Sequence, residues 1–219
     1  MSGGDYVAGG RRLGDVPRTT AATGPAAVRR AIRRRTSPSA AWWGILMVIA
    51  SEGVLFAAMI GTFFYLRFNN VHWPLPGDPE PKVILPIVLV AILSTTSVLM
   101  QLAWRAARAG ALGLVRVFLV VALVVQSGYF AYEATDFGHE LRATPIDRDA
   151  YTSIHYTLLG ADHAHVFLGI LFNVWLLWKF ARGITTYRAN ALQAITWYWH
   201  FVNILTWVVV GTITSAAVG

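Results

Sequence analysis

Residues 151–180 impose the strongest constraint on what this chain can fold into. The stretch is apolar and long enough to cross a membrane, yet it carries His155, Asp162, His165 and Asn173. Their spacings of seven, three and eight residues place all four on one side of a helix, opposite Leu, Val, Phe and Trp. A charged or polar side chain at mid-bilayer costs roughly 2.5–3.5 kcal/mol, so such residues normally face protein or trapped water. We therefore expect a membrane helix whose polar seam contacts other helices.

Four further apolar segments repeat this pattern along the chain. The sequence is 56% hydrophobic and only 13% charged, which is too apolar for an ordinary soluble domain. A segment of about 20 apolar residues matches the roughly 30 Å of hydrocarbon in a bilayer. The sequence thus predicts an all-α, polytopic integral membrane protein. Its bundle of five transmembrane helices is expected at about residues 42–66, 83–104, 114–135, 151–180 and 192–218.

Residues 1–40 differ in composition from the membrane domain, residues 41–219. They hold eight arginines against two aspartates, which predicts a flexible cytoplasmic tail. Together with the connections between spans two and three and between spans four and five, this tail holds 14 of the 18 basic residues. The positive-inside rule then places the N-terminus in the cytoplasm and the C-terminus outside. Because the basic residues alternate with apolar segments instead of sharing one face, we expect no nucleic-acid partner.

The other predicted spans also carry polar residues, mostly along one side. Glu52 lies near the middle of the first span, and by helix rise Glu52, His165 and Asn203 come within roughly two turns of the midplane. A carboxyl group at that depth is expected to be neutral or paired, and His165 is the candidate partner. We predict a buried polar network with these members: Glu52, Asp162, His165, His200 and Asn203. Its secondary members are expected to be His155, Gln126, Glu133 and Ser94.

Residue spacing leaves three interpretations of this network open: hydrogen-bonded ties between helices, a proton relay, or ligation of a metal or haem. Ligation is the least favoured, because His163 and His165 are two residues apart and point roughly 200° away from each other on a helix. His165 and His200 also differ in depth by about 9 Å. The chain has no cysteine, which excludes thiolate metal sites and thioether-linked haem. We therefore expect neither catalytic residues nor metal ligands here.

Five separated motifs follow one another along the membrane domain. They are Ser51-Glu52, the segment Leu93–Val98, Gln126 with Tyr132-Glu133, the set Tyr151, Ser153, Gly160, His165-Val166 and Gly169, and the segment Tyr198–Val202. In this order they resemble the cytochrome c oxidase subunit III family of haem–copper oxygen reductases. The resemblance runs from about Trp42 to the end of the chain and excludes the arginine-rich tail. Each motif alone is a weak signal, and their order makes the resemblance specific.

Several positions depart from the family pattern. Asp162 stands where the family usually has a histidine, His163 stands at a glycine position, and Asn203 replaces the usual aspartate. Tyr129 takes the place of an acidic residue expected shortly after Gln126. Five predicted spans instead of seven are similar to the shorter bacterial members.

The resemblance implies an accessory subunit of a proton-pumping terminal oxidase that reduces oxygen to water. It implies a subunit without its own cofactor, in a bacterial cytoplasmic membrane, packed beside subunits I and II, which carry the haem and copper. Bound phospholipid and support of proton uptake by the neighbouring subunit are also implied, with Glu52 at the position of the family's buried glutamate. The alternatives are a subunit of a quinol oxidase or nitric oxide reductase, and a stand-alone transporter or haem-binding anchor. A supercomplex with a cytochrome c or quinol-oxidising complex is a further expectation.

Overall fold

The computed structural model describes residues 40–76 and 81–217, which form five long helices and one short turn of 3-10 helix. The helices are α2 (Ala40–Phe68), α3 (Ile84–Ala109), α4 (Leu112–Ala143), α5 (Ala150–Phe180) and α6 (Thr186–Thr214), followed by η1 (Ser215–Ala217). All five are long and apolar enough to cross a membrane, and the described residues contain no strand. The prediction of an all-α protein with five potential membrane spans is therefore confirmed. The predicted tail, residues 1–40, lies almost wholly outside the described residues.

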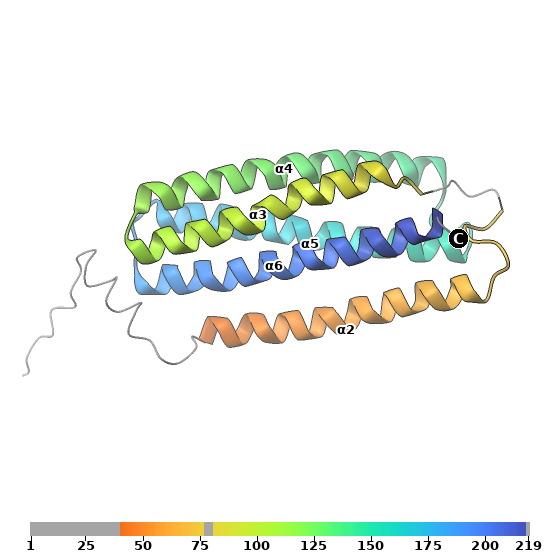
Figure 1. The fold of residues 1–219 in the computed structure, drawn as a ribbon, viewed down its shortest axis with the longest axis horizontal. Helices are drawn as coiled ribbons and strands as arrows, with labels where there is room; N and C mark the ends of the chain where they lie inside the picture. Colours follow the sequence, from red (N-terminus) through yellow and green to blue (C-terminus); the bar gives the residue numbers. More distant parts are fainter. Residues whose placement is uncertain (1–39, 77–80, 218–219) are drawn as a thin grey trace, which may run out of the picture.

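Four of the helices, α3 to α6, form a closed bundle in which each helix packs against two others. The packed pairs are α3 with α4, α4 with α5, α5 with α6, and α6 with α3. Successive helices run in opposite directions, and α2 lies along the outside of the bundle against α5 and α6 (Figure 1). Helix α5 therefore contacts α2, α4 and α6, so its polar side chains have three different helices as neighbours.

The core is apolar and its largest members come from α6. The side chains of Tyr198 and Trp199 are 1% and 0% exposed. Gly169 of α5 makes room for the indole, because a Cβ atom at this position would lie 2.6 Å from Trp199 Cζ2. Helix α2 contributes only two fully buried side chains, Phe56 and Phe63. Other apolar side chains of α2, among them Met47, Val54 and Leu55, are exposed, as expected for a helix in contact with lipid or with another membrane protein.

All five helices are longer than their predicted spans, most clearly at the end of α4 and the start of α6. Helix α4 continues to Ala143, although the predicted third span ends at residue 135. Helix α6 begins at Thr186, where the Thr185 hydroxyl accepts a hydrogen bond from the Arg188 N–H at 3.2 Å and caps the helix. The apolar run locates the part of a helix in hydrocarbon, whereas the capping residues and ion pairs set where the helix ends. The additional turns of α4 carry acidic residues that the sequence had placed in a loop.

Candidate functional site: polar contacts between the helices

Glu52 of α2 and His165 of α5 are brought together, as the sequence predicted. Glu52 Oε2 lies 3.2 Å from His165 Nε2, with the two side chains 30% and 15% exposed. His165 Nδ1 lies 2.7 Å from the carbonyl oxygen of Ala161. A carbonyl can only accept a hydrogen bond, so Nδ1 carries a hydrogen and Nε2 faces the carboxyl group. The Glu52 carboxyl group and His165 Nε2 thus form a direct polar contact between α2 and α5.

The other histidines of α5 face α4. His163 Nε2 lies 3.8 Å from Glu133 Oε2, and its Nδ1 lies 2.6 Å from the Leu159 carbonyl oxygen. His155 Nε2 lies 3.9 Å from Glu140 Oε2. His163 and His165 thus contact different helices, which agrees with the expectation that they point away from each other. Each histidine of α5 presents Nε2 to a glutamate of a neighbouring helix.

The remaining polar residues of α5 contact further helices, so they do not form one shared seam. Asp162 is 1% exposed, and its Oδ1 accepts a hydrogen bond from the Thr206 hydroxyl of α6 at 2.8 Å. Asn173 Nδ2 donates to Gln126 Oε1 of α4 at 2.8 Å, with both side chains fully buried. The polar side of α5 thus reaches α2, α4 and α6 separately.

The polar faces of α3 and α6 pair with each other in three successive contacts. Trp207 Nε1 donates to Ser94 Oγ at 2.8 Å, and Asn203 Nδ2 donates to Ser97 Oγ at 2.8 Å. His200 Nε2 lies 3.5 Å from Gln101 Oε1. His200 and Asn203, expected in one network with Glu52, belong to this separate set of contacts. Both sets of residues recur at helical spacing in the sequence, and the structure brings the two faces together.

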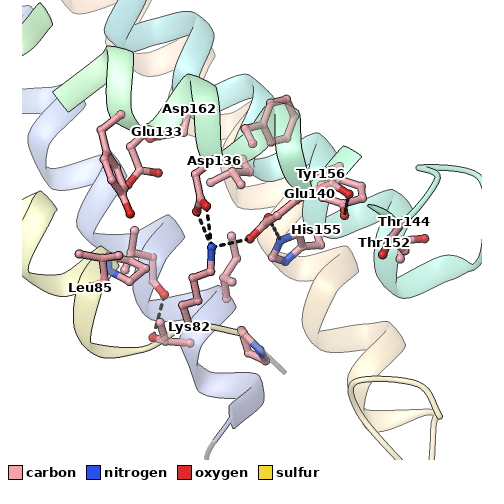
Figure 2. Close-up of a pocket in the computed structure, with 18 of the residues that line it drawn as sticks. Lys82, Leu85, Glu133, Asp136, Glu140, Thr144, Thr152, His155, Tyr156 and Asp162 are labelled. Atoms are coloured by element: carbon pink, nitrogen blue, oxygen red, sulfur yellow. Dashed lines mark hydrogen bonds and ion pairs between the residues drawn. The ribbon is translucent and has the colours of Figure 1, made fainter. Parts of the chain in front are cut away.

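A charged cluster at one end of the bundle was not predicted as part of the site. Lys82, just before α3, binds both carboxylate oxygens of Asp136 at 2.7 Å and lies 3.4 Å from Glu140 (Figure 2). The hydrogen bond to Asp136 is the main reason that the pKa of Lys82 is raised above its ordinary value of 10.5. The spacing of Glu133, Asp136 and Glu140, three and then four residues, is helical. That spacing is the signal that could have extended the third predicted span.

Both ring nitrogens of His165, Nδ1 of His163 and Nε2 of His200 contact protein partners. The buried His155 Nδ1 and His163 Nε2 have no hydrogen-bond partner among the described residues. Among residues 40–76 and 81–217, no group of three or more His, Asp or Glu side chains is placed to hold a metal ion. The polar contacts join α2 to α5, α4 to α5, α5 to α6 and α3 to α6. Chemically, this arrangement is suited to tying membrane helices together and to holding protons at Glu–His pairs.

A helical bundle that can span a membrane five times and is joined by buried polar contacts defines a multi-pass membrane protein. No family model matches the chain. It is 30% identical over 178 residues to cytochrome c oxidase subunit 3 of Bacillus subtilis, covering 78% of this chain and 83% of that protein. It is also 30% identical over 177 residues to cytochrome bo(3) ubiquinol oxidase subunit 3 of Pseudomonas aeruginosa, covering 78% and 82%. Probable cytochrome c oxidase subunit 3 of Nocardia farcinica is 26% identical over 190 residues, covering 85% and 93%.

The chain belongs to the subunit III family of cytochrome c and quinol oxidases. It is thus part of an oxidoreductase complex of the haem–copper type, and the resemblance of its five motifs to that family is confirmed. The motifs lie at the contacts described above: Ser51-Glu52 and His165-Val166 at the α2–α5 pair, Leu93–Val98 and Tyr198–Val202 where α3 meets α6.

Proposed function

We propose that the chain is an accessory, cofactor-free subunit of a proton-pumping terminal oxidase that reduces oxygen to water in a bacterial cytoplasmic membrane. The observation that carries the proposal is 30% identity with a cytochrome c oxidase subunit 3 over 83% of that protein's length. Haem and copper are then held by partner subunits I and II. The subunit stabilises the catalytic subunit, binds phospholipid and supports proton uptake.

The hydrogen bonding of the histidines supports a subunit without haem. A haem ligand must offer a free ring nitrogen to the iron. In His165, Nδ1 is bound to Ala161 and Nε2 faces Glu52, and in His200, Nε2 faces Gln101. Ligation at His165 or at His200 Nε2 would break one of these contacts and leave a polar group of a neighbouring helix unpaired. Such a group costs about 1–3 kcal/mol when it is buried.

The weak attachment of α2 supports a docking role for this helix. Its side chains are mostly exposed, and Glu52 is accessible at 30% although it contacts His165. An exposed apolar helix face with one polar group fits either lipid or a helix of a neighbouring subunit. In this proposal Glu52 supports the neighbour through structure, as a hydrogen-bonded tie.

The electron donor is an open choice between cytochrome c and quinol, because the relatives include both kinds of oxidase. The donor is bound by other subunits in this proposal, so the same subunit III fold serves either complex. A subunit of a nitric oxide reductase is a weaker alternative, because the relatives described above are named as oxidases.

The proposal is tested by purifying the native complex through this chain and identifying its components by mass spectrometry. We expect haem–copper subunits I and II at equal stoichiometry, and oxygen consumption with either cytochrome c or quinol. The chain expressed alone should show no Soret band. A stoichiometric haem signal that disappears in His165→Ala or His200→Ala would contradict the proposal. Reporter fusions should give a cytoplasmic signal at residue 1 and an external signal at residue 219.

A further inference from the structure

A cavity of about 550 Å³ lies at the end of the bundle where α4 ends and α5 begins. Its mouth carries Lys82, Asp136 and Glu140, whose side chains are 47%, 31% and 32% exposed. Tyr129 and Asp162, which are 6% and 1% exposed, line its inner part. This volume is typical of pockets for small organic ligands. The cavity therefore leads from a charged, accessible mouth to a buried polar wall.

The inner wall has more hydrogen-bonding capacity than the chain itself uses. Tyr129, Glu133 and Asp162 all line the cavity and lie close enough to interact electrostatically. Asp162 Oδ1 accepts one hydrogen bond, from a threonine hydroxyl, and Glu133 has a histidine nitrogen at 3.8 Å. The Tyr129 hydroxyl makes no hydrogen bond to any residue in the described part of the chain. Two carboxyl groups and one free hydroxyl thus border the same space.

At the mouth of the cavity, carboxyl groups of α4 bind an ammonium group. There, the Lys82 ammonium is held by Asp136 and Glu140 (Figure 2). Glu133 lies one helical turn before Asp136 on the same face of α4, farther from the mouth. The acidic groups are not arranged in a set of three that could hold a metal ion within the described residues. An organic cation has a larger radius than a metal ion and carries directional N–H donors. It can therefore be bound where three carboxyl groups do not converge on one point.

Apolar side chains form the rest of the cavity lining. Leu85 of α3, Leu159 of α5 and Val210 and Ile213 of α6 all contribute to it. We propose that the cavity binds an organic cation consisting of a protonated amine on an apolar body. The ammonium group lies at the inner wall formed by Tyr129, Glu133 and Asp162, and the apolar body lies along these aliphatic side chains. This inference does not depend on the assignment to an oxidase.

Binding is measured on the full chain in detergent with 2-phenylethylamine as the probe and 2-phenylethanol as its neutral counterpart. The two molecules have the same apolar body, and only the amine carries a positive charge. We expect the amine to bind saturably and at least tenfold more tightly than the alcohol. Binding is measured by calorimetry and by the rise in melting temperature. Equal affinity for the two probes would overturn the proposal, because it would leave only an apolar crevice.

Two variants locate the site. Tyr129→Phe removes only the free hydroxyl and Glu133→Gln removes one carboxylate, and each should weaken amine binding severalfold without changing alcohol binding. Asp147→Asn, at an exposed residue outside the cavity lining, removes the same charge and should leave the affinity unchanged. Melting curves without ligand identify any misfolded variant. If Glu133→Gln is misfolded, amine binding by Tyr129→Phe tests the location of the site. Wild-type amine affinity in a folded Tyr129→Phe and Glu133→Gln double variant would contradict this location.

The ammonium group could belong to a lipid headgroup or to a soluble amine, and nanodiscs distinguish these sources. Phosphatidylethanolamine carries a primary ammonium group, whereas the quaternary group of phosphatidylcholine has no N–H donor. Loss of probe binding in phosphatidylethanolamine but not in phosphatidylcholine would identify the lipid headgroup as the occupant. Binding in both lipids would indicate a soluble amine, and absence of binding in both would overturn the proposal.

Discussion

Substitution of Glu52 separates a structural tie from a proton carrier. In the wild type, Glu52 Oε2 lies 3.2 Å from His165 Nε2. In Glu52→Gln the new side-chain amide can donate a hydrogen bond to His165 Nε2 over the same distance. The loss of stability should therefore be about 1 kcal/mol or less. Glu52→Ala leaves the Nε2 atom of His165, a side chain only 15% exposed, without its partner, which costs about 1–3 kcal/mol. The cavity left by the alanine adds little, because Glu52 is 30% exposed and lipid can fill the space.

The assay combines melting of the purified chain, native gels of the assembled complex and oxygen consumption over many turnovers. We expect Gln to retain binding of the subunit and sustained turnover, and Ala to lose the subunit or to lose activity progressively. Ser51→Ala is the matched control, because its hydroxyl donates only to the Val48 carbonyl of its own helix. If Glu52→Gln abolished proton pumping while the subunit stayed bound, Glu52 would be an obligatory proton carrier and the tie would be wrong.

Three further predictions concern other contacts of the bundle. Gly169→Ala should destabilise the chain by about 1–3 kcal/mol in thermal melts, because its Cβ would overlap the Trp199 indole. Asn173→Ala should cost about 1–3 kcal/mol by leaving the buried Gln126 without its partner, and an added Gln126→Leu should recover part of this loss. The raised pKa of Lys82 means that its contribution to stability is fully present below pH 10.5 and is lost as the pH rises through the higher folded-state value. Alkaline melting should therefore be less pH-dependent in Lys82→Met than in the wild type.

The helical period predicted that α3 and α6 are each apolar except on one side, but it did not predict that these two helices meet. When only one side of each helix can form hydrogen bonds, the two polar sides must meet or face another polar group. Ser94, Ser97 and Gln101 accordingly face Trp207, Asn203 and His200. The pairing of Glu52 with His165 followed from the same reasoning together with estimated depth. Period therefore identified the polar face of each helix, and estimated depth identified one contact, between Glu52 and His165.

The same reasoning failed where one helix has several neighbours. The polar residues of α5 span an arc that touches α2, α4 and α6, and the sequence does not show how many helices surround it. Thr206 was missed as the partner of Asp162, because a threonine in a membrane helix usually bonds to its own backbone. The Thr206 hydroxyl oxygen also lies 3.0 Å from the Val202 carbonyl oxygen of its own helix, the usual partner for such a threonine. The cavity was missed because its lining comes from four segments that only the folded bundle brings together.

The geometry of α5 supports the proposal that its histidines tie helices together and do not exchange protons freely. In both His163 and His165, Nδ1 is held by a carbonyl four residues earlier, at 2.6 and 2.7 Å, so the ring orientation is fixed by α5 itself. Only Nε2 is left to meet the glutamate of the neighbouring helix. Passing a proton onward would require one ring to rotate and break its bond to the helix, or water to reach Nε2. A hydrogen-bonded contact between helices requires neither ring rotation nor entry of water, so it is the simpler role for these Glu–His pairs.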